Sequence, residues 1–467
     1  MGKISHSLAV KLVVVMSLLA GCQSPKLSEL TQDPFSILKT VQKSIAEPIV
    51  KESDQNDTMT SSLGKILDGS LNNGNSGSDF VSVLAMALEN DPIIISKRRE
   101  VDAKTAAVGS TSAQKEFQVS STVYGGIEDV TDNTKGIALA LNASRLVYDG
   151  GLLDAQISSQ QYLADSSKLD LAATLDQRAL RLGKLWIELE KYEALKDQIE
   201  GRLAVLDPLI AQLEQVAKAG IGDVSKVTAA QRTVAAIRVT ETNISEGYAQ
   251  AQLEFSNAFG VLKKDISYNS ELVASLVPQK LSNESAQNAP ALLSQYAIYK
   301  SYLAKVASLK AKDKFNVGFE ARAMRPFAGS GYDSDESVGL VARKTLFTGG
   351  MLESEIAEAE SSAKASLARI QATYREGSRA VEMAKQNIVS MEKAISLAKK
   401  NAELTANEIV YLRQQLVIGG STLDSVLSAE ARLYEAESKE INFAAEKQKS
   451  ELTIVSALGL LSPALGL

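Results

Sequence analysis

The chain repeats itself once, and this duplication limits its possible folds more than any other feature of its 467 residues. Leu146–Asp154 resembles Thr345–Glu353, and the glycine pairs inside these segments are 199 residues apart. The same offset relates Ala258–Leu262 to Ala457–Leu461, so the register holds without a gap for more than 100 residues. A repeat of this length predicts two equivalent halves, at 80–262 and 289–467, joined by an inter-repeat linker or equatorial segment at 263–288.

Each half contains two stretches in which apolar residues alternate with other residues. They lie at about 117–128 and 136–148 in the first half, and at about 315–324 and 337–347 in the second. Alternation with a period of two predicts β-strands with two unlike faces. About 10 residues is the length that a tilted strand needs to cross a bilayer, so we expect four transmembrane strands in each chain.

After each glycine pair the apolar period changes from two to seven. In the first half one heptad position is occupied in turn by Leu185, Tyr192, Ile199, Leu206 and Leu213. Sustained heptads are typical of coiled-coil helices. We therefore predict two long helical hairpins, with helices at 151–219 and 224–260 in the first half and at 350–417 and 422–459 in the second. The predicted fold class is mainly α with transmembrane β.

Four strands are too few to form a pore on their own. A sheet inserted in a bilayer leaves its edge N–H and C=O groups without partners, and lipid cannot supply them. Three chains would provide twelve strands, an even number within the usual range of bacterial barrels. We therefore expect a homotrimer in which a 12-stranded β-barrel continues into a barrel of α-helices.

The start of the chain has the pattern of a targeting signal. Lys3 and Lys11 precede an apolar run that is too short to span a membrane. The segment Leu19–Cys22 resembles the bacterial lipobox, which implies a signal peptide at 1–21, acylation of Cys22 with palmitate-type chains and a lipid-anchored protein. Residues 22–79 are predicted to be an acylated N-terminus and polar tether. An ordinary signal peptide with an incidental cysteine is the alternative.

The positions of His6 and Cys22 exclude several classes of enzyme. They are the only histidine and the only cysteine, and His6 lies inside the predicted signal. The mature chain would lack histidine-based triads, cysteine nucleophiles and the usual zinc and copper ligands. It has no P-loop or dinucleotide-binding glycine motif. We predict no enzymatic activity and no cofactor, and the net charge of −6 argues against nucleic acid as a partner.

With these elements in order, the chain resembles the TolC family of outer-membrane efflux proteins over residues 80–461. The closest matches are Val147–Gly151 and Gly419–Ala429. The resemblance implies a trimeric channel in the outer membrane that extends into the periplasm. It also implies a periplasmic adaptor and an inner-membrane transporter, either ABC-type or proton-driven, as partners. The implied cargo covers drugs, small toxic compounds and, in type I secretion, proteins.

The resemblance also places a channel aperture at the hairpin tips. In the family, acidic residues near the start of the last return helix surround the aperture. The matching positions here are Ser425 and Ser428, which carry no charge, while Asp424 is adjacent. The hypothesis is that Asp424 or Asp223 from three protomers lines the constriction. Alternatively, both are first-turn acids that interact favourably with the helix dipole.

Two sets of glycines mark places where the chain turns sharply. The first set lies at the hairpin tips, where the resemblance implies adaptor docking: Gly220, Gly222, Gly419 and Gly420. The second set lies where a strand leads into a long helix: Gly150, Gly151, Gly349 and Gly350.

Two other classes of protein are weighed against the channel. A trimeric coiled-coil surface lipoprotein, either an adhesin or a structural fibre, would not need paired ten-residue strands between its helices. A periplasmic lipoprotein enzyme would need a catalytic constellation, and the sequence contains none that we recognise.

Overall fold

The computed structural model describes residues 79–129, 134–219, 224–260, 267–278, 287–329 and 332–465. All of them belong to one unit, Asn73–Leu467. The predicted signal peptide, the lipidation site Cys22 and the tether as far as residue 78 lie outside the described residues. So do Gly220, Gly222 and Asp223 at the first hairpin tip.

The two halves contain the same elements in the same order. The first half has α4 (Phe80–Glu89), α5 (Pro92–Ser112), β1 (Gln118–Asp129), β2 (Thr134–Tyr148), α6 (Leu152–Lys218) and α7 (Val224–Phe259). The second has α10 (Pro290–Ala311), β3 (Asn316–Gly329), β4 (Asp335–Arg343), α11 (Met351–Val417) and α12 (Leu423–Ala457). The short helices α8 (Ser270–Leu276) and α13 (Leu461–Ala464) follow the first and second halves.

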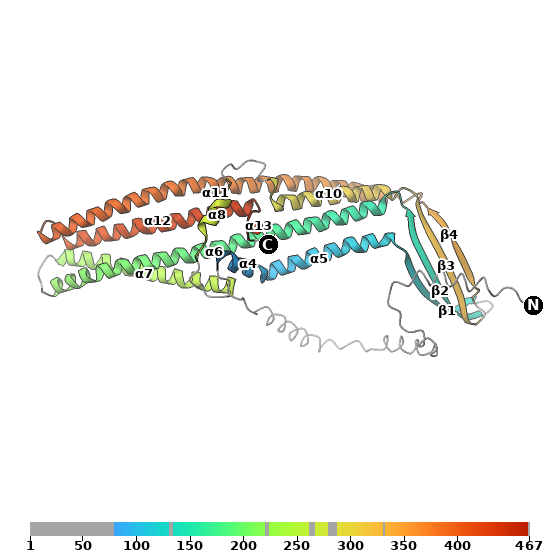
Figure 1. The fold of residues 1–467 in the computed structure, drawn as a ribbon, viewed down its shortest axis with the longest axis horizontal. Helices are drawn as coiled ribbons and strands as arrows, with labels where there is room; N and C mark the ends of the chain where they lie inside the picture. The colour runs from blue at the N-terminus through green and yellow to red at the C-terminus, as the bar shows by residue number, and fades with distance from the viewer. Residues whose placement is uncertain are drawn as a thin grey trace, which may run out of the picture. The chain divides into compact units, whose positions relative to one another are not determined.

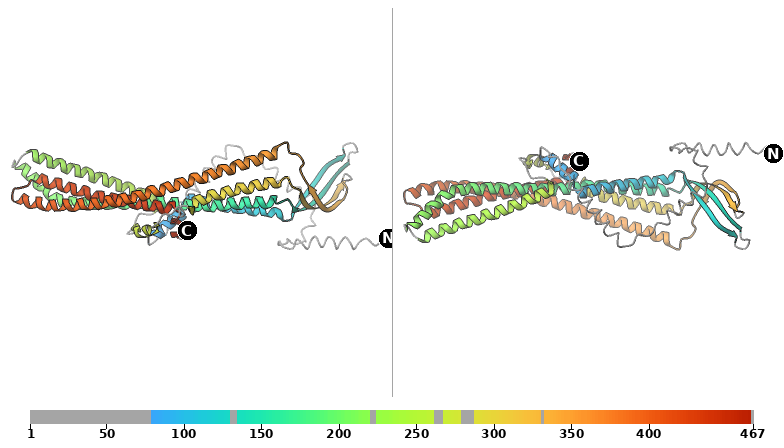
Figure 2. Two further views of the ribbon diagram at one scale, coloured as in Figure 1. Left: turned by 90° about the horizontal axis from the view of Figure 1, so that it is seen from above. Right: turned by 90° about the horizontal axis from the view of Figure 1, so that it is seen from below.

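Within this unit the long helices lie lengthwise beside one another, with the sheet at one end and the hairpin tips at the other (Figure 1; Figure 2). Helices α6 and α11 have 67 residues each, or about 100 Å at 1.5 Å per residue. Helix α6 remains α-helical past Pro208. None of the helices in the described ranges is both long and apolar enough to cross a membrane.

The four strands form one antiparallel sheet in the order β1-β2-β3-β4, and the β2–β3 pairing joins the two halves. In its register, the two central rows on opposite faces differ in polarity. One row across the sheet reads Val119, Ala143, Ala321, Val338. The next row, on the other face, reads Ser120, Asn142, Arg322, Ser337. Val119 and Val338 are 66% and 75% exposed, so the apolar face is uncovered within one chain.

The strands of the second half differ in length from the prediction. Strand β3 continues past the predicted end at 324 to Gly329 because a register shift beside Pro326 accommodates a residue that has no N–H to donate. Strand β4 starts at Asp335 and stops at Arg343, short of the predicted 347. Arg343 pairs with Asn316, the first residue of β3, so the segment after Arg343 has no strand to pair with.

The largest core lies around Trp186, near the middle of α6. The Trp186 ring contacts the rings of Phe80, Phe255 and Phe259 at centroid distances of 5.1, 5.1 and 5.3 Å. Tyr268, just before α8, packs against Phe80. A second core continues toward the hairpin tips along α6, α7 and α12: Leu195, Ile199, Leu203, Leu206, Ala230, Ile237, Ile244 and Leu427. Heptad packing therefore supports the long hairpins.

Candidate functional site

The two strand-to-helix turns have nearly the same backbone geometry. Gly150 and Gly151 have φ values of 70° and 89°, and Gly349 and Gly350 have 64° and 84°. Only glycine adopts two successive left-handed conformations at little cost. In the first turn the Asp149 carboxylate also accepts hydrogen bonds from the N–H groups of Gly151 and Leu153, at 2.9 and 2.6 Å. The turns fix the direction in which each long helix leaves the sheet.

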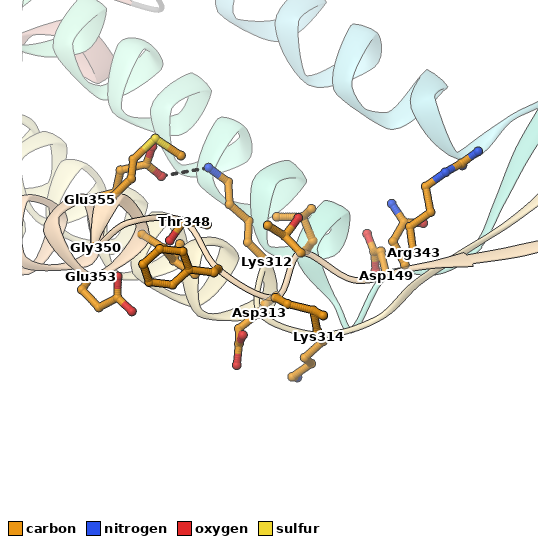
Figure 3. Close-up of a pocket in the computed structure, with 17 residues that line it drawn as sticks. Asp149, Lys312, Asp313, Lys314, Arg343, Thr348, Gly350, Glu353 and Glu355 are labelled. Atoms are coloured by element: carbon orange, nitrogen blue, oxygen red, sulfur yellow. Dashed lines mark hydrogen bonds and ion pairs between the residues drawn. The ribbon is translucent and has the colours of Figure 1, made fainter.

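A surface cavity of about 410 Å³ lies beside the second turn, between the ends of α10 and β4 and the start of α11 (Figure 3). Its basic groups are engaged in contacts within the chain. Lys312 points toward Glu355 and forms an ion pair with it at 2.9 Å. Lys314 donates to the carbonyl oxygen of Gly150 at 2.9 Å, and Arg343 pairs with Glu320. The cavity therefore lies where the sheet meets the helices of both halves.

The tip of the second hairpin is a glycine-terminated helix end followed by a capped helix start. Gly419 has φ 81°, and Gly420 N–H donates to the Gln415 carbonyl at 2.9 Å, which is the Schellman pattern. Thr422 is the N-cap of α12, and its hydroxyl oxygen accepts from Ser425 N–H at 3.2 Å. The tip is thus a short, well-bonded turn.

The structure places Asp424, Ser425 and Ser428 together in the first turns of α12, and all three are half-buried. Ser425 also shares a hydrogen bond of 2.8 Å with the Thr422 hydroxyl, so it takes part in the cap. Within the described ranges no basic side chain pairs with Asp424. Among the residues that the structure describes, Asp424 is therefore an acid at this tip without an ion-pair partner.

A buried polar network lies about two turns further along α12, and the sequence prediction did not include it. Arg202 of α6 pairs with Glu430 at 2.8 Å and with Glu437 at 2.7 Å. Arg413 of α11 pairs with Glu430 at 2.7 Å. Gln198 donates to Glu437 at 2.9 Å. One possible signal was the replacement of Gln231 in the first half by Glu430 in the second, which adds a charge at a repeated position.

These residues belong to the sheet, to the strand-to-helix turns and to contacts between the long helices. The sheet has one apolar and one polar face, the turns set the helices at its end, and the charged network fastens α12 to α6 and α11. Such an arrangement suits a protein that encloses a path for solutes.

Comparison with known proteins supports this interpretation. Residues 281–460 match the family described as "Outer membrane efflux protein". No curated protein sequence matches the chain. The solved structure of CusC, described in terms of transmembrane channel formation, is similar to this chain with a TM-score of 0.71 and 17% identity. The match covers 83% of this chain and 95% of CusC.

Two further solved structures have the same fold. The outer membrane protein VceC from Vibrio cholerae is similar with a TM-score of 0.69 and 15% identity, over 81% of this chain and 95% of VceC. The open state of the MtrE outer membrane channel from Neisseria gonorrhoeae has a TM-score of 0.66 and 12% identity, over 81% of this chain and 88% of MtrE. At these identities the structures establish a shared fold.

Proposed function

We propose that this chain is a TolC-like outer membrane efflux protein and that three copies form the exit duct of an export system. Its fold and the family match of residues 281–460 support the proposal. The strands of the trimer would form a twelve-stranded barrel in the outer membrane. The helical hairpins would continue it as a tunnel into the periplasm.

The single observation that carries this proposal is the open, two-faced sheet. Among the described strands, β1 and β4 each have one neighbour, so both edges of the sheet carry unpaired backbone groups. The face that contains Val119 and Val338 is apolar and exposed, which suits lipid, whereas the face that contains Arg322 is polar, which suits a water-filled lumen. Pairing β4 of one copy with β1 of the next would remove every edge.

The rest of the export system follows from the same proposal. The hairpin tips, with Gly419 and Gly420 in the second and Gly220 and Gly222 in the first, would dock a periplasmic adaptor. The adaptor would connect the duct to an inner-membrane ABC or proton-driven transporter, and the cargo would be drugs, small toxic compounds or secreted proteins. Acylation of Cys22 would anchor each chain in the membrane.

The test uses the full-length protein extracted from membranes in detergent. Unheated samples should migrate as trimers in gel electrophoresis and heated samples as monomers, and the unheated protein should form conducting channels in planar bilayers. A soluble monomer that does not conduct would contradict the proposal.

Two adjacent residues of β4 provide matched variants. Val338→Asp places a charge on the lipid face and should reduce the heat-sensitive trimer. The cost on that face is roughly 2–4 kcal/mol for a basic side chain at the bilayer midplane, falls toward the interfaces, and is smaller for an acid. Ser337→Asp places the same charge on the polar face and should leave the trimer intact. Equal behaviour of the two variants would show that the two faces do not differ in this way.

A further inference from the structure

At the helix-proximal end of the sheet, an exposed phenylalanine lies beside a basic side chain in each half of the chain. In the first half the Arg145 guanidinium lies over the Phe117 ring, 5.2 Å from its centroid. In the second half the Lys344 ammonium lies 5.7 Å from the centroid of the Phe315 ring. The two rings are 54% and 56% exposed. The four residues occupy equivalent repeat positions, so the arrangement is duplicated with the fold.

Arg145 lies on the apolar face of the sheet, and the second pair lies just beyond the strand ends, with Phe315 before β3 and Lys344 after β4. Arg145 is in register with Phe319, and the Phe117 ring contacts the Phe319 ring edge-to-face at 6.1 Å. Arg145 follows Ala143 by two residues on β2, so the two side chains share a face. We call Phe117, Arg145, Phe315 and Lys344 the basal belt.

The basal belt lies at one border of the apolar band. On the same face, Arg325 of β3 is in register with Leu139 of β2. Leu139 lies six residues before Arg145 on the same strand. Six residues of strand span about 20 Å along the strand, and less along the bilayer normal because the strands of membrane barrels tilt. The long side chains of Arg145 and Arg325 can extend from these positions toward the headgroups. This step rests on the proposed function: in a membrane barrel the belt would lie at the headgroup level of the periplasmic leaflet.

The basic groups at the two borders differ in their partners. Arg325, at the far border, forms an ion pair with Glu336. In the described part of the chain, Arg145 has no carboxylate partner, and its Nε donates only to the Lys115 carbonyl at 3.4 Å. Lys344 has only Asp313, at 3.9 Å, whose side chain is 72% exposed. The belt therefore carries positive charge that the chain leaves largely unneutralised.

We propose that the basal belt binds the phosphate groups of anionic phospholipids in the periplasmic leaflet. The Nη groups of Arg145 suit two parallel hydrogen bonds to phosphate oxygens. Contact with the Phe117 ring holds the guanidinium close to the barrel wall. The exposed rings would lie against the glycerol and upper acyl region of the same lipids, since aromatic side chains favour the interface. A trimer would present six such pairs around its circumference.

The test compares full-length trimers purified in detergent and titrated with dioleoyl phosphatidylglycerol, dioleoyl phosphatidylcholine or inorganic phosphate. Lipid retention is measured by native mass spectrometry. The wild type should retain phosphatidylglycerol in preference to phosphatidylcholine. The variant Arg145→Gln with Lys344→Gln should bind phosphatidylglycerol about fivefold more weakly for each cation removed. The matched control is Arg322→Gln, which removes a cation from the polar face of the same sheet.

Three results would contradict the assignment of the basal belt as a lipid-binding site. Equal phosphatidylglycerol retention by the wild type and the double variant overturns the assignment, and so does displacement of the lipid by millimolar inorganic phosphate, which would indicate a general anion site. Loss of the lipid-free trimer in the double variant also overturns it, because the cations would then contact a neighbouring chain. Failure of the wild type to form a conducting trimer contradicts the proposed function instead, so the two failures are distinguishable.

Discussion

Arg202 of α6 and Glu430 of α12 form an ion pair of 2.8 Å that fastens the second half of the chain to the first. The two side chains are 18% and 2% exposed, so both charges are largely removed from water. Arg413 of α11 gives Glu430 a second basic partner at 2.7 Å. One buried carboxylate thus connects three long helices, at a level between the hairpin tip and the Trp186 core.

Replacement of Glu430 by alanine should destabilise the helical hairpins. The substitution removes the carboxylate that pairs with Arg202 and Arg413. Breaking a buried ion pair lowers the free energy of unfolding by about 3–5 kcal/mol. We expect a value near the lower limit because Arg202 retains Glu437 and Arg413 is 45% exposed. Thermal unfolding of the helices, followed by circular dichroism in detergent, measures the effect.

The internal repeat provides the control for this experiment. Gln231 occupies the position in α7 that Glu430 occupies in α12, and it is exposed. Gln231→Ala should change the melting temperature little, since exposed positions rarely contribute more than about 0.5 kcal/mol. Equal losses in the two variants would contradict a special role for the buried pair.

Asp176 of α6 should make stability depend on pH. Burial raises its pKa from 3.8 to about 6, although N–H groups of Ser462 and Leu461 lower it in part. Its Oδ1 accepts from Ser462 N–H at 2.8 Å, while Oδ2 is buried with no hydrogen-bond partner among the described residues. Between about pH 4 and pH 6 the folded chain therefore holds a proton that the unfolded chain has lost.

The sign follows from this difference in bound protons. The free energy of unfolding should fall as pH rises through that window, by about 3 kcal/mol for a shift of about two pKa units. The Asp176→Asn variant keeps an oxygen for the Ser462 N–H and cannot ionise, so it should lack this decline. Melting temperatures of both proteins between pH 4 and pH 7 test the expectation, and parallel curves would contradict it.

The repeated segments around Gly150 and Gly349 made the architecture predictable from the sequence. Alternation with a period of two and heptads with a period of seven are local signals, and both depend on one buried face per element. Local signals also predicted the beginnings and ends of the long helices within one or two residues. The strand ends at Gly329 and Arg343 were less predictable, because they depend on which residues of the neighbouring strand remain available for pairing.

The contacts between the two halves could not be predicted from the sequence. Glu430 lies in a helix that is rich in acidic residues, and nothing local distinguishes it from Glu435 or Glu440. Its burial arises because α6 packs against α12 at that level and places Arg202 beside it. Lys314 and Gly150 are 164 residues apart and meet only because β2 pairs with β3. Contacts of this kind depend on tertiary packing, which the periodicity of apolar residues in the sequence does not predict.

The glycines Gly150 and Gly349 should respond differently to substitution by alanine although they occupy equivalent turns. Both have positive φ values, so each variant carries a backbone penalty of about 1–2 kcal/mol. A Cβ at Gly150 would also lie 2.6 Å from the Cβ of Lys314, whereas no atom of the described residues lies within 4 Å of one at Gly349. Lys314 would have to move and would lose its hydrogen bond to the Gly150 carbonyl.

We therefore expect Gly150→Ala to lower the melting temperature more than Gly349→Ala does. The yield of the heat-sensitive trimer should follow the same order, because the affected turn connects the sheet to α6. A Gly349→Ala variant that is equally or more destabilised would show that the Lys314 contact contributes little to the cost.

Asp424 should influence ion flow if three copies meet at the hairpin tips. Its carboxylate has no ion-pair partner in the described part of the chain. If Asp424 lines the aperture, a trimer would place three such charges around the axis. Divalent cations should then bind between them and reduce the current. Asp424→Ala should weaken block by magnesium at least about fivefold, because each pair of unit charges about 4 Å apart in water contributes about 1 kcal/mol and the variant removes three carboxylates from around a divalent ion.

Single-channel recordings in planar bilayers measure this block, and Ser428→Ala, one turn further along α12, is the control that leaves the charge unchanged. The N-cap of α12 is kept constant in this comparison, because Thr422 provides it and remains in both variants. Loss of Asp424 therefore removes a charge from the tip without removing the side chain that starts the helix. Unchanged conductance and magnesium block in Asp424→Ala would leave this acid with the role of a first-turn residue that interacts with the helix dipole.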